Sequence, residues 1–232
     1  MASIFITGNS NGLGLGLTRH YLQQGDRIYG LSRSDCPLQS TALDQRRIDL
    51  ARLDHIQPTL DGWLPSRLDL VILNAGILGQ IQDLADTDLD DIKAIMDINV
   101  WANKLIIDWL ARNTRQLDQL VLISSGASVN GNRGWSGYSL SKATLNMLAR
   151  LYAQEMPDTH ICALAPGLIH TRMQDYLCQQ VDSSRYPSIQ HLIAARDTDA
   201  MPAIDEAATR IAGAFKRCLD HPSGSFLDIR QL

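Results

Sequence analysis

The sequence has few cysteines, no paired cysteine motif, no basic block and no long apolar run, and each absence excludes a class of protein. Its four cysteines, Cys36, Cys162, Cys178 and Cys218, are widely scattered, which argues against a disulfide framework and a zinc site. The six histidines show no metal-ligand spacing either. We therefore expect no metal centre.

Charge and hydropathy exclude two kinds of partner. The formal net charge is −4, and no cluster of Lys and Arg forms a footprint for a phosphate backbone, so nucleic acid is not an expected partner. No apolar run approaches the roughly 18 residues of a membrane span. The first expected strand begins at Ser3, which leaves no room for a signal peptide. We expect a cytoplasmic protein with no membrane partner.

Short apolar runs alternate with helical patterns along the whole chain, which is typical of a parallel sheet with helices on both faces. The runs at 70–73 and 120–123 are continuously apolar, as in strands buried on both faces. We predict strands at 3–7, 27–32, 46–49, 69–73, 119–124, 160–164 and 225–229, and helices at 13–24, 51–61, 87–113, 136–156 and 203–219. The predicted fold class is α/β: one Rossmann-type doubly wound domain over residues 1–232, with a mostly parallel seven-stranded sheet.

Two local features refine this prediction. Asp86-Thr87 is a plausible cap for the helix at 87–113. Residues 171–201 are the least regular segment, and we predict a surface excursion with one or two short helices. Because the segment follows a strand at the carboxyl edge of the sheet, where ligands bind in such folds, it is a candidate substrate loop, with Met173, Tyr176 and Leu177 on its pocket side.

The first strand runs directly into a glycine-rich turn and then into a helical pattern, which is the context of a dinucleotide-binding turn. Gly8 permits the tight turn, Gly12 lets the backbone approach a pyrophosphate, and Gly14 allows close packing of helix on strand. The anion would rest on the N–H groups at the helix start. Thr7 and Leu13 complete the predicted cofactor-binding residues of this turn.

Tyr138 and Lys142 stand four residues apart in a predicted helix, so their side chains share one face. A neighbouring ammonium stabilises a phenolate and lowers the pKa of tyrosine from its ordinary value near 10. Tyr138 could then donate or take a proton near neutrality. Chance also places such pairs on amphipathic helices, and the glycine turn is what gives this pair weight. Ser125 precedes Tyr138 by thirteen residues.

Six motifs in this order resemble the short-chain dehydrogenase/reductase family, over nearly the whole chain. They are its glycine turn at 7–14, an Asn-Ala-Gly after the fourth strand, a mid-helix asparagine, an active serine, the Tyr-x-x-x-Lys pair and a Pro-Gly-x-x-x-Thr loop beside the nicotinamide. The matching residues beyond the glycine turn are Asn74, Ala75, Gly76, Asn99, Ser125, Tyr138, Lys142, Pro166, Gly167 and Thr171.

The resemblance implies reduction of a carbonyl by a hydride from the nicotinamide and a proton from the protein. Tyr138 would be the acid, Lys142 would lower its pKa and hydrogen-bond the nicotinamide ribose, and Ser125 would hold the substrate oxygen. The family's spacing selects Ser125 rather than Ser124. Asn99 would anchor a water that links Lys142 to solvent, or would simply satisfy backbone groups at a bend in its helix.

The end of the second predicted strand bears on the choice of cofactor. An NAD-binding turn usually has a carboxylate there, whereas this chain has Ser32 followed by Arg33. A serine leaves room for a 2′-phosphate, and a guanidinium can pair with it, so we expect NADP(H). The alternative is a solvated Arg33 with NAD bound. Asp49 and Leu50 resemble the family's adenine-edge contact, and we expect Asp35 to point to solvent.

The segment around Trp135 resembles the branch of NADPH-dependent carbonyl, benzil and sepiapterin reductases. The expected substrate is a small ketone or aldehyde, and Trp135 either walls the pocket or only packs. Two alternatives remain: an NAD-dependent alcohol dehydrogenase, and a non-catalytic regulator that senses NADP(H). We expect a homodimer through the helices at 87–113 and 136–156. The helix carrying Tyr138 has an apolar stripe of Ala143, Met147, Leu148 and Leu151, which fits a dimer face or ordinary core.

Overall fold

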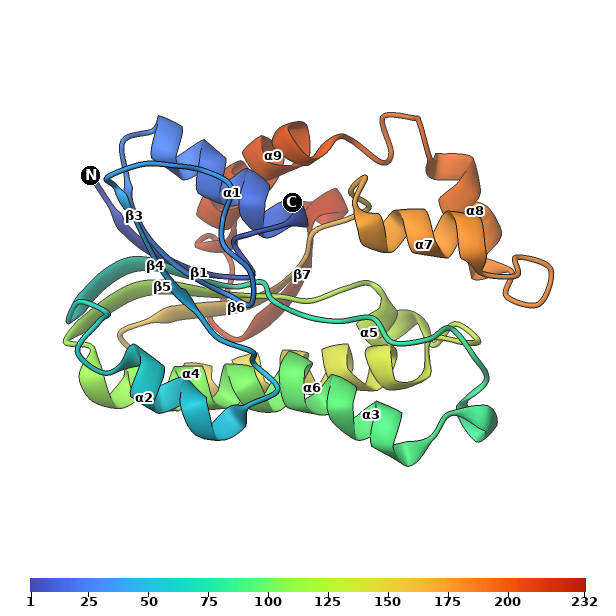
Figure 1. The fold of residues 1–232 in the computed structure, drawn as a ribbon, viewed down its shortest axis with the longest axis horizontal. Coiled ribbons are helices and arrows are strands. Elements are labelled where there is room, and N and C mark those ends of the chain that lie inside the picture. Colours follow the sequence, from blue (N-terminus) through green and yellow to red (C-terminus); the bar gives the residue numbers. More distant parts are fainter.

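A computed structural model describes all 232 residues and contains one seven-stranded sheet (Figure 1). The strand order is β3-β2-β1-β4-β5-β6-β7, and every pairing is parallel, so the predicted doubly wound α/β fold is confirmed. The strands are β1 Ser3–Thr7, β2 Arg27–Ser32, β3 Leu43–Arg47, β4 Arg67–Leu73, β5 Gln116–Ile123, β6 His160–Ala165 and β7 Ser225–Asp228.

Helices cover both faces of the sheet (Figure 1). In that view α1 and α9 lie above the sheet, and α2, α3, α4 and α6 lie below it. The helices are α1 Gly12–Gln23, α2 Ile56–Leu60, α3 Leu89–Met96, α4 Ala102–Asn113, α5 Ala127–Asn130, α6 Ser136–Glu155, α7 Arg172–Gln180, α8 Ser188–Ala195 and α9 Ile204–Cys218. No helix is long and apolar enough to cross a membrane, and the four cysteines are free thiols.

The continuously apolar strands serve two cores. In β1, Phe5 is buried in the core between the sheet and helices α2, α4 and α6. Ile4 and Ile6 are buried in the core between the sheet and helices α1 and α9. In β4, Val71 and Ile72 divide between the same two cores. Successive side chains of a strand point to opposite faces, so burial on both faces requires every residue to be apolar.

Several predicted boundaries were wrong. The strand predicted at 46–49 is β3 at Leu43–Arg47, because this edge strand is mostly polar and the apolar Ile48 lies just beyond it. The helix predicted from residue 87 is capped by Asp88, whose carboxylate accepts a hydrogen bond from the Asp90 N–H, rather than by Asp86-Thr87. The helix predicted at 51–61 is a 3-10 turn, Leu53–His55, followed by α2.

The helix predicted at 87–113 is divided into three parts. Between α3 and α4 the backbone forms a π-helical turn over Asp97–Trp101, which buries Asn99 and Val100. A π-helical turn holds one more residue than the α-helical turn it replaces, and such turns occur often at functional sites. The prediction of one uninterrupted helix missed it.

The excursion predicted at 171–201 contains α7 and α8, which lie at the right-hand end of the view in Figure 1. A third, smaller core packs these helices against the loops that follow β4 and β5. Its buried members are Leu78, Ile81, Ala127, Trp135, Leu177, Tyr186, Ile189 and Leu192. This core is separate from the two cores of the sheet.

Candidate active site

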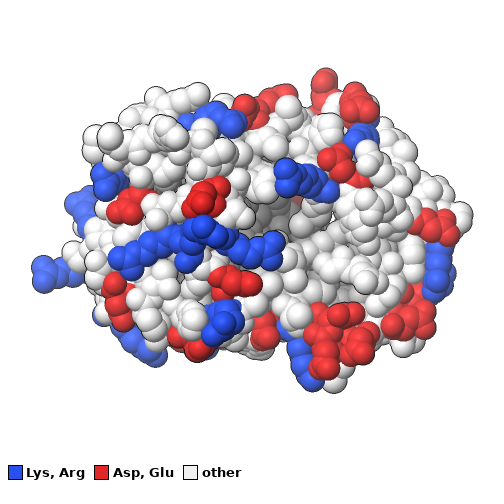
Figure 2. Space-filling model, in the orientation of Figure 1, with Lys and Arg blue, Asp and Glu red and all other residues white.

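The carboxyl ends of the strands open into one cleft of about 720 Å³. Figure 2 shows the molecule hollowed near the centre of one face, with Lys or Arg side chains on two sides of the hollow. Nearly all the residues predicted for the site line this cleft: all but Thr7, Gly14 and Asn99. Thr7 and Asn99 are fully buried, and Gly14 lies in the first turn of α1.

The glycine turn leaves no space for side chains where the chain reverses. A Cβ placed on Gly14 would lie 2.2 Å from the Gly8 carbonyl oxygen, and Gly8 itself has a positive φ of 72°. Asn11 caps α1 without a side-chain hydrogen bond, so the N–H groups of the first turn are not capped by their own N-cap side chain. This is a cradle for an anion at a helix N-terminus.

The ends of β1 and β4 are tied together by Thr7 and Asn74. The Thr7 hydroxyl accepts hydrogen bonds from the backbone N–H groups of Asn74 and Ala75, at 3.0 and 3.1 Å. The Asn74 amide donates to the Thr7 carbonyl at 3.0 Å. The predicted Asn-Ala-Gly segment therefore shapes the cleft mainly by fixing the backbone below it.

Another part of the cleft is lined by residues at or after the ends of β2 and β3, namely Ser32, Arg33, Asp49 and Leu50. The Ser32 hydroxyl donates to the Ser34 carbonyl at 2.7 Å. Asp49 accepts a hydrogen bond from the Ala51 N–H at 3.0 Å, which leaves its second oxygen for another donor.

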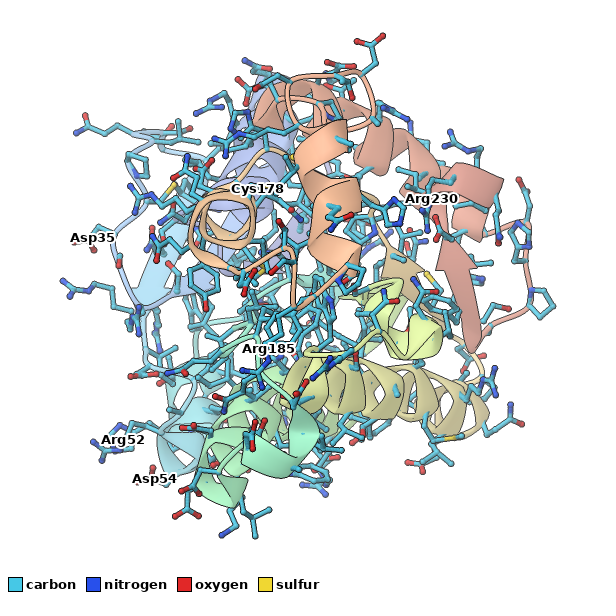
Figure 3. All side chains as sticks on the ribbon, turned by 90° about the vertical axis from the view of Figure 1, so that its right-hand side faces the viewer. Asp35, Arg52, Asp54, Cys178, Arg185 and Arg230 are labelled. Carbon is cyan, nitrogen blue, oxygen red and sulfur yellow. The ribbon has the colours of Figure 1, made fainter.

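Asp35 points to solvent as predicted, and Figure 3 draws it at the edge of the molecule. It pairs with Arg47 at 3.4 Å rather than with Arg33. The guanidinium of Arg33, which lines the cleft, is therefore not neutralised by this neighbouring carboxylate.

Ser125, Tyr138 and Lys142 meet on one wall of the cleft. Ser125 follows the end of β5, Tyr138 is in the first turn of α6, and Lys142 lies one turn later. The Lys142 ammonium lies 5.7 Å from the centre of the Tyr138 ring. Ser124 is buried and donates to the Asn146 side chain at 2.6 Å, so its hydroxyl is occupied away from this group.

The pKa of Tyr138 does not follow the sequence prediction. Burial of the phenol raises its pKa, and the nearby Ser125 side chain acts in the opposite direction. The Lys142 ammonium makes its hydrogen bond to the Ile123 carbonyl, at 2.7 Å, rather than to the phenol. Burial also lowers the pKa of Lys142 to about 8, since a charged ammonium is poorly solvated there.

Asn99 lies behind the cleft wall in the π-helical turn. Its side chain exchanges two hydrogen bonds with the backbone of Ile77, at 2.8 and 2.9 Å, and donates to the Ser141 hydroxyl at 3.0 Å. The backbone carbonyl of Asn99 accepts a hydrogen bond from the Asn103 side chain at 2.8 Å. The side chain thus satisfies backbone groups, which is one of the two predicted roles. The water-anchoring role stays a prediction.

The loop after β6 brings the glycine turn and the excursion together. Pro166, Gly167 and Thr171 all line the cleft, and Thr171 is the N-cap residue of α7. The Thr171 methyl group lies 3.6 Å from the position that a Cβ on Gly12 would occupy. The start of α7 is therefore seated beside the start of α1.

Beside Tyr138 the cleft is bordered by Trp135 and the excursion. The Trp135 ring is 5.9 Å from that of Tyr138, and its indole N–H donates to the Ser188 hydroxyl at 2.9 Å. Met173 and Leu177 line the cleft, whereas Tyr176, also predicted there, does not. Trp135 thus both packs in the small core and borders the cleft.

Sequence reasoning missed several cleft residues, namely Asn130, Asn132, His191, Leu192, Asp228 and Arg230. Asp228 ends β7, so the rule that ligands bind at the carboxyl ends of strands could have found it and Arg230. No comparable signal marks His191 or Leu192 on α8, because their position depends on how α8 packs.

Comparison with known proteins agrees with this geometry. Residues 2–182 match the family model described as short chain dehydrogenase. An uncharacterized oxidoreductase of Schizosaccharomyces pombe, C30D10.05c, is 32% identical over 181 residues, which are 74% of this chain and 72% of that protein. The benzil reductase ((S)-benzoin forming) IRC24 of Saccharomyces cerevisiae is 30% identical over 74% of this chain and 73% of its own.

The fold also matches solved structures. The short-chain dehydrogenase/reductase YIR035C of Saccharomyces cerevisiae superposes with a TM-score of 0.84 at 22% identity, covering 99% of this chain and 96% of its own. Families of this kind are oxidoreductases that use a nicotinamide cofactor. The fold, the family match and the sequence relatives agree: this chain belongs to the short-chain dehydrogenase/reductase family.

Proposed function

We propose that this protein is an NADPH-dependent oxidoreductase that reduces a ketone or aldehyde carbonyl to an alcohol, with Tyr138 as general acid. The observation that carries the proposal is the convergence of Ser125, Tyr138 and Lys142 in the same cleft as the glycine turn. A nicotinamide cofactor bound there would supply the hydride. The cradle suits its phosphates, because Gly8, Gly12 and Gly14 leave backbone where side chains would stand.

The side chains divide the remaining chemistry. The Tyr138 phenol, whose pKa is raised, is protonated at neutral pH and can donate its proton to the carbonyl oxygen as negative charge grows there. The Ser125 hydroxyl, beside the phenol, donates a second hydrogen bond to the same oxygen. The Lys142 ammonium, held in the same wall, stabilises the phenolate left after proton transfer. Asn99 acts as a positioning residue through the backbone of Ile77.

The test replaces the proton donor alone. Tyr138→Phe should lower kcat by about 10²- to 10⁴-fold, the usual contribution of general acid catalysis. Its Kd for NADPH, measured by fluorescence titration, should remain within about threefold of the unmodified protein, since the ring is kept. Tyr176→Phe, a tyrosine of α7 outside the cleft, is the control and should keep full activity. A Tyr138→Phe protein with unchanged turnover would overturn the proposal in favour of a cofactor-sensing regulator.

The choice of serine gives a second test. Ser125→Ala should lower kcat/KM by about 10²-fold, because a donor to the developing oxyanion is lost. Ser124→Ala removes a neighbouring hydroxyl that is committed to Asn146 and should leave kcat/KM within a few-fold of the unmodified protein. Equal losses in both variants would assign the serine effect to packing.

NADPH is the proposed cofactor because Ser32 and Arg33 occupy the end of β2 with no carboxylate between them and the cleft. A guanidinium can hold a 2′-phosphate with two parallel hydrogen bonds. The unmodified protein should bind NADPH at least tenfold more tightly than NADH, and Arg33→Asp should reverse that order. Preference of the unmodified protein for NADH would favour the NAD-dependent alcohol dehydrogenase instead.

An α-diketone is the substrate class that we would assay first. Three relatives are benzil reductases, among them IRC24 and a Bacillus subtilis protein that is 29% identical over 75% of this chain. The wall beside Tyr138 carries the flat Trp135 ring and the apolar Leu177 and Leu192, which suit an aryl group. A panel of aryl diketones, pterins and simple aldehydes, followed by NADPH oxidation, measures the preference. No turnover with any of these compounds would favour the alternative of a non-catalytic regulator that senses NADP(H).

We also propose a homodimer through α4 and α6. Leu140, Met147 and Leu151 repeat along α6 with about half of each side chain exposed, and Trp101, at the start of α4, is 40% exposed. Such apolar surface is often an interface. Light scattering should give twice the chain mass, and Met147→Glu with Leu151→Glu should give the single-chain mass. A monomeric unmodified protein would refute this arrangement.

A further inference from the structure

We propose that Arg172 is a cofactor-binding residue, which holds the pyrophosphate of the dinucleotide from the side of the cleft opposite the glycine turn. The inference rests on the proposed function and adds an anion contact to the glycine turn and Arg33. It also makes the first turn of the excursion part of the cofactor site.

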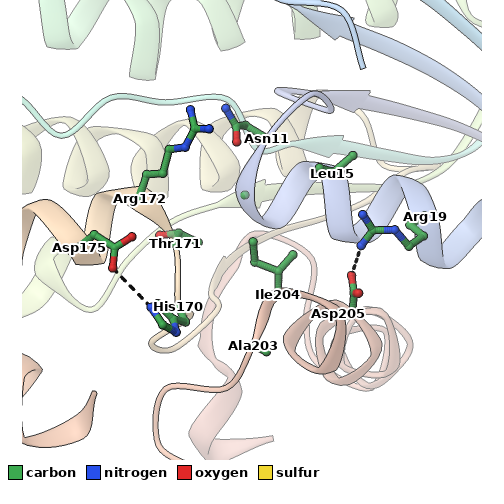
Figure 4. A pocket seen from close by; sticks show the side chains of 11 residues that line it. Asn11, Leu15, Arg19, His170, Thr171, Arg172, Asp175, Ala203, Ile204 and Asp205 are labelled. Carbon is green, nitrogen blue, oxygen red and sulfur yellow. Dashed lines mark hydrogen bonds and ion pairs between the residues drawn. The ribbon is translucent and has the colours of Figure 1, made fainter. Parts of the chain in front are cut away.

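Arg172 occupies the junction of two cavities. It is the first residue of α7 and lines both the large cleft and a neighbouring pocket of about 430 Å³. The same two cavities share Asn11, Gly12 and Thr171. Figure 4 shows the Arg172 side chain extended from α7 toward Asn11, which precedes α1. Because Asn11 and Gly12 belong to the glycine turn, the guanidinium borders the same space as the start of α1.

The charges around Arg172 are otherwise paired. Asp175 accepts a hydrogen bond from Arg196 at 2.7 Å and lies 3.4 Å from His170. Arg19 forms an ion pair with Asp205 (Figure 4). Arg172 has neither an ion pair nor a side-chain hydrogen bond to the protein, so it is the one charged side chain of this pocket without a protein partner. An uncompensated guanidinium beside an uncapped helix start adds positive charge where an anion is already favoured.

The position of this charge selects the pyrophosphate among the phosphates of NADPH. The 2′-phosphate is expected at Ser32 and Arg33, at the end of β2. These two residues line the large cleft but not the 430 Å³ pocket, which Arg172 and Gly12 also line. A pyrophosphate presents several oxygens to a planar guanidinium, which can bind two of them with parallel hydrogen bonds. The contact would also join α7 to the bound cofactor.

The experiment separates the two phosphate sites with fragments of the cofactor. ADP-ribose carries the pyrophosphate without a 2′-phosphate, and 2′-AMP carries a 2′-phosphate without the pyrophosphate. Their Kd values, and that of NADPH, are measured by calorimetry for the unmodified protein, Arg172→Gln, Arg172→Lys, Arg33→Gln and Arg210→Gln. Arg210 is an exposed arginine of α9 that lines neither cavity, so its variant is the charge-matched control.

Arg172→Gln should raise the Kd values for NADPH and for ADP-ribose by the same factor, about tenfold, as expected for the loss of a hydrogen bond from a charged group. It should leave 2′-AMP unchanged. Arg33→Gln should show the opposite pattern between the two fragments, Arg172→Lys should fall between the unmodified protein and Arg172→Gln, and Arg210→Gln should change nothing. In 0.5 M salt the Kd values of Arg172→Gln and of the unmodified protein should differ by a smaller factor, because exposed charges are screened.

Three results would overturn the inference while the proposed function stands. They are unchanged ADP-ribose binding in Arg172→Gln, a loss confined to 2′-AMP, and unchanged Kd values with a raised KM for anionic carbonyl substrates only. The last result would assign Arg172 to the substrate. Failure of the unmodified protein to bind NADPH and ADP-ribose would instead refute the proposed function, and Arg172 would lose its ligand with it.

Discussion

The side of the cleft that contains the glycine turn, which is the proposed cofactor side, and the side formed by the excursion, which is the proposed substrate side, are held together by different kinds of contact. On the cofactor side, Thr7 and Asn74 tie two strand ends through backbone groups, and Gly8 and Gly14 bring backbone against backbone. On the substrate side the excursion is attached by side chains, such as Trp135 bonded to Ser188. On the first side, side chains bond to backbone and glycines let backbone approach backbone, whereas on the second side the contacts join side chain to side chain.

The substrate side also has the smaller core. Its core contains 8 buried residues, whereas the two cores of the sheet contain 24 and 19. At its edge Asp83 binds Arg133 with two hydrogen bonds, at 2.7 and 2.6 Å, and Arg185 at 3.0 Å. These partners keep the pKa of Asp83 well below its ordinary value. A segment with little buried apolar surface opens locally before the domain unfolds, so we expect the two sides to respond differently to mutation.

The largest effect is expected at the glycine turn. A methyl group on Gly14 would lie 2.2 Å from the Gly8 carbonyl oxygen, so Gly14→Ala must displace the turn. We expect NADPH affinity to fall at least 100-fold, with a loss of about 1–3 kcal/mol in the free energy of unfolding from overpacking. Fluorescence titration and urea denaturation measure both. Gly213→Ala, in the middle of α9 with only the end of Arg217 nearby, should instead stabilise the protein by about 0.5–1 kcal/mol. Normal NADPH binding by Gly14→Ala would remove the distinction between the two sides.

Two buried tyrosines, one in the small core of the excursion and one in a core of the sheet, sharpen the comparison. Tyr186, 4% exposed, covers Gly134 in the small core, and Tyr152, 7% exposed, packs in the large core. Each change to Ala should cost about 3 kcal/mol. For Tyr186→Ala the loss should be local: hydrogen exchange should accelerate over residues 173–195 while the global unfolding midpoint moves little. For Tyr152→Ala the midpoint itself should fall. Equal global losses would show that the excursion unfolds together with the sheet.

Lys142 gives the cofactor side a pH dependence of its own. Its pKa is about 8 in the folded protein, below the ordinary 10.5, so between these values the unfolded chain binds more protons than the folded one. The free energy of unfolding should therefore rise with pH in this window, by at most about 1.4 kcal/mol per pH unit. Below pH 8 the charged lysine disfavours folding by its full amount. The difference between the unmodified protein and Lys142→Met isolates this contribution. A difference that is flat from pH 8 to 10.5 would contradict the burial of this ammonium.

The smallest effect is expected at Asp83. Exposed ion pairs contribute little to stability, so Asp83→Asn should leave the melting temperature and the Kd for NADPH nearly unchanged. It should still loosen the excursion, with a few-fold faster hydrogen exchange over 183–190 and a few-fold higher KM for the carbonyl substrate. High salt should have the same effect on the unmodified protein. Asp90→Asn, which breaks an exposed pair with Lys93 away from the cleft, is the control. A changed NADPH affinity in Asp83→Asn would place this ion pair on the cofactor side.

Sequence reasoning placed the glycine turn and the Tyr138–Lys142 pair correctly, because these features depend on residue type and spacing. Gly8 and Gly14 are required by backbone geometry wherever a strand turns tightly into a helix, and Tyr138 and Lys142 share a face in any helix. The strands buried on both faces were also predicted, since continuous apolar runs such as 70–73 mark them. The polar edge strand β3 lacks that signal, and its position was therefore wrong.

The substrate side was predicted only as a segment. Nothing local to Ser188 or Leu192 indicates that α8 turns them toward Trp135 and the cleft, since this depends on contacts between distant parts of the chain. The predicted direction of the Tyr138 pKa was wrong for a related reason: helical spacing places Lys142 nearby, but tertiary packing buries the phenol, and burial raises its pKa. Spacing predicts which groups are neighbours, and packing decides which of them interact.

The π-helical turn at Asp97–Trp101 makes the number of residues in this part of the chain as important as their identity. Each residue advances an α-helix by about 100°, so an extra residue in regular winding would rotate everything after it. The π-helical turn absorbs that residue, and α4 keeps its apolar face toward the sheet. Deleting one residue there should therefore leave Ile106 and Leu110 against the sheet but remove the turn that buries Asn99 and Val100. Homologues that keep this geometry should vary in length within the excursion rather than between α3 and α4.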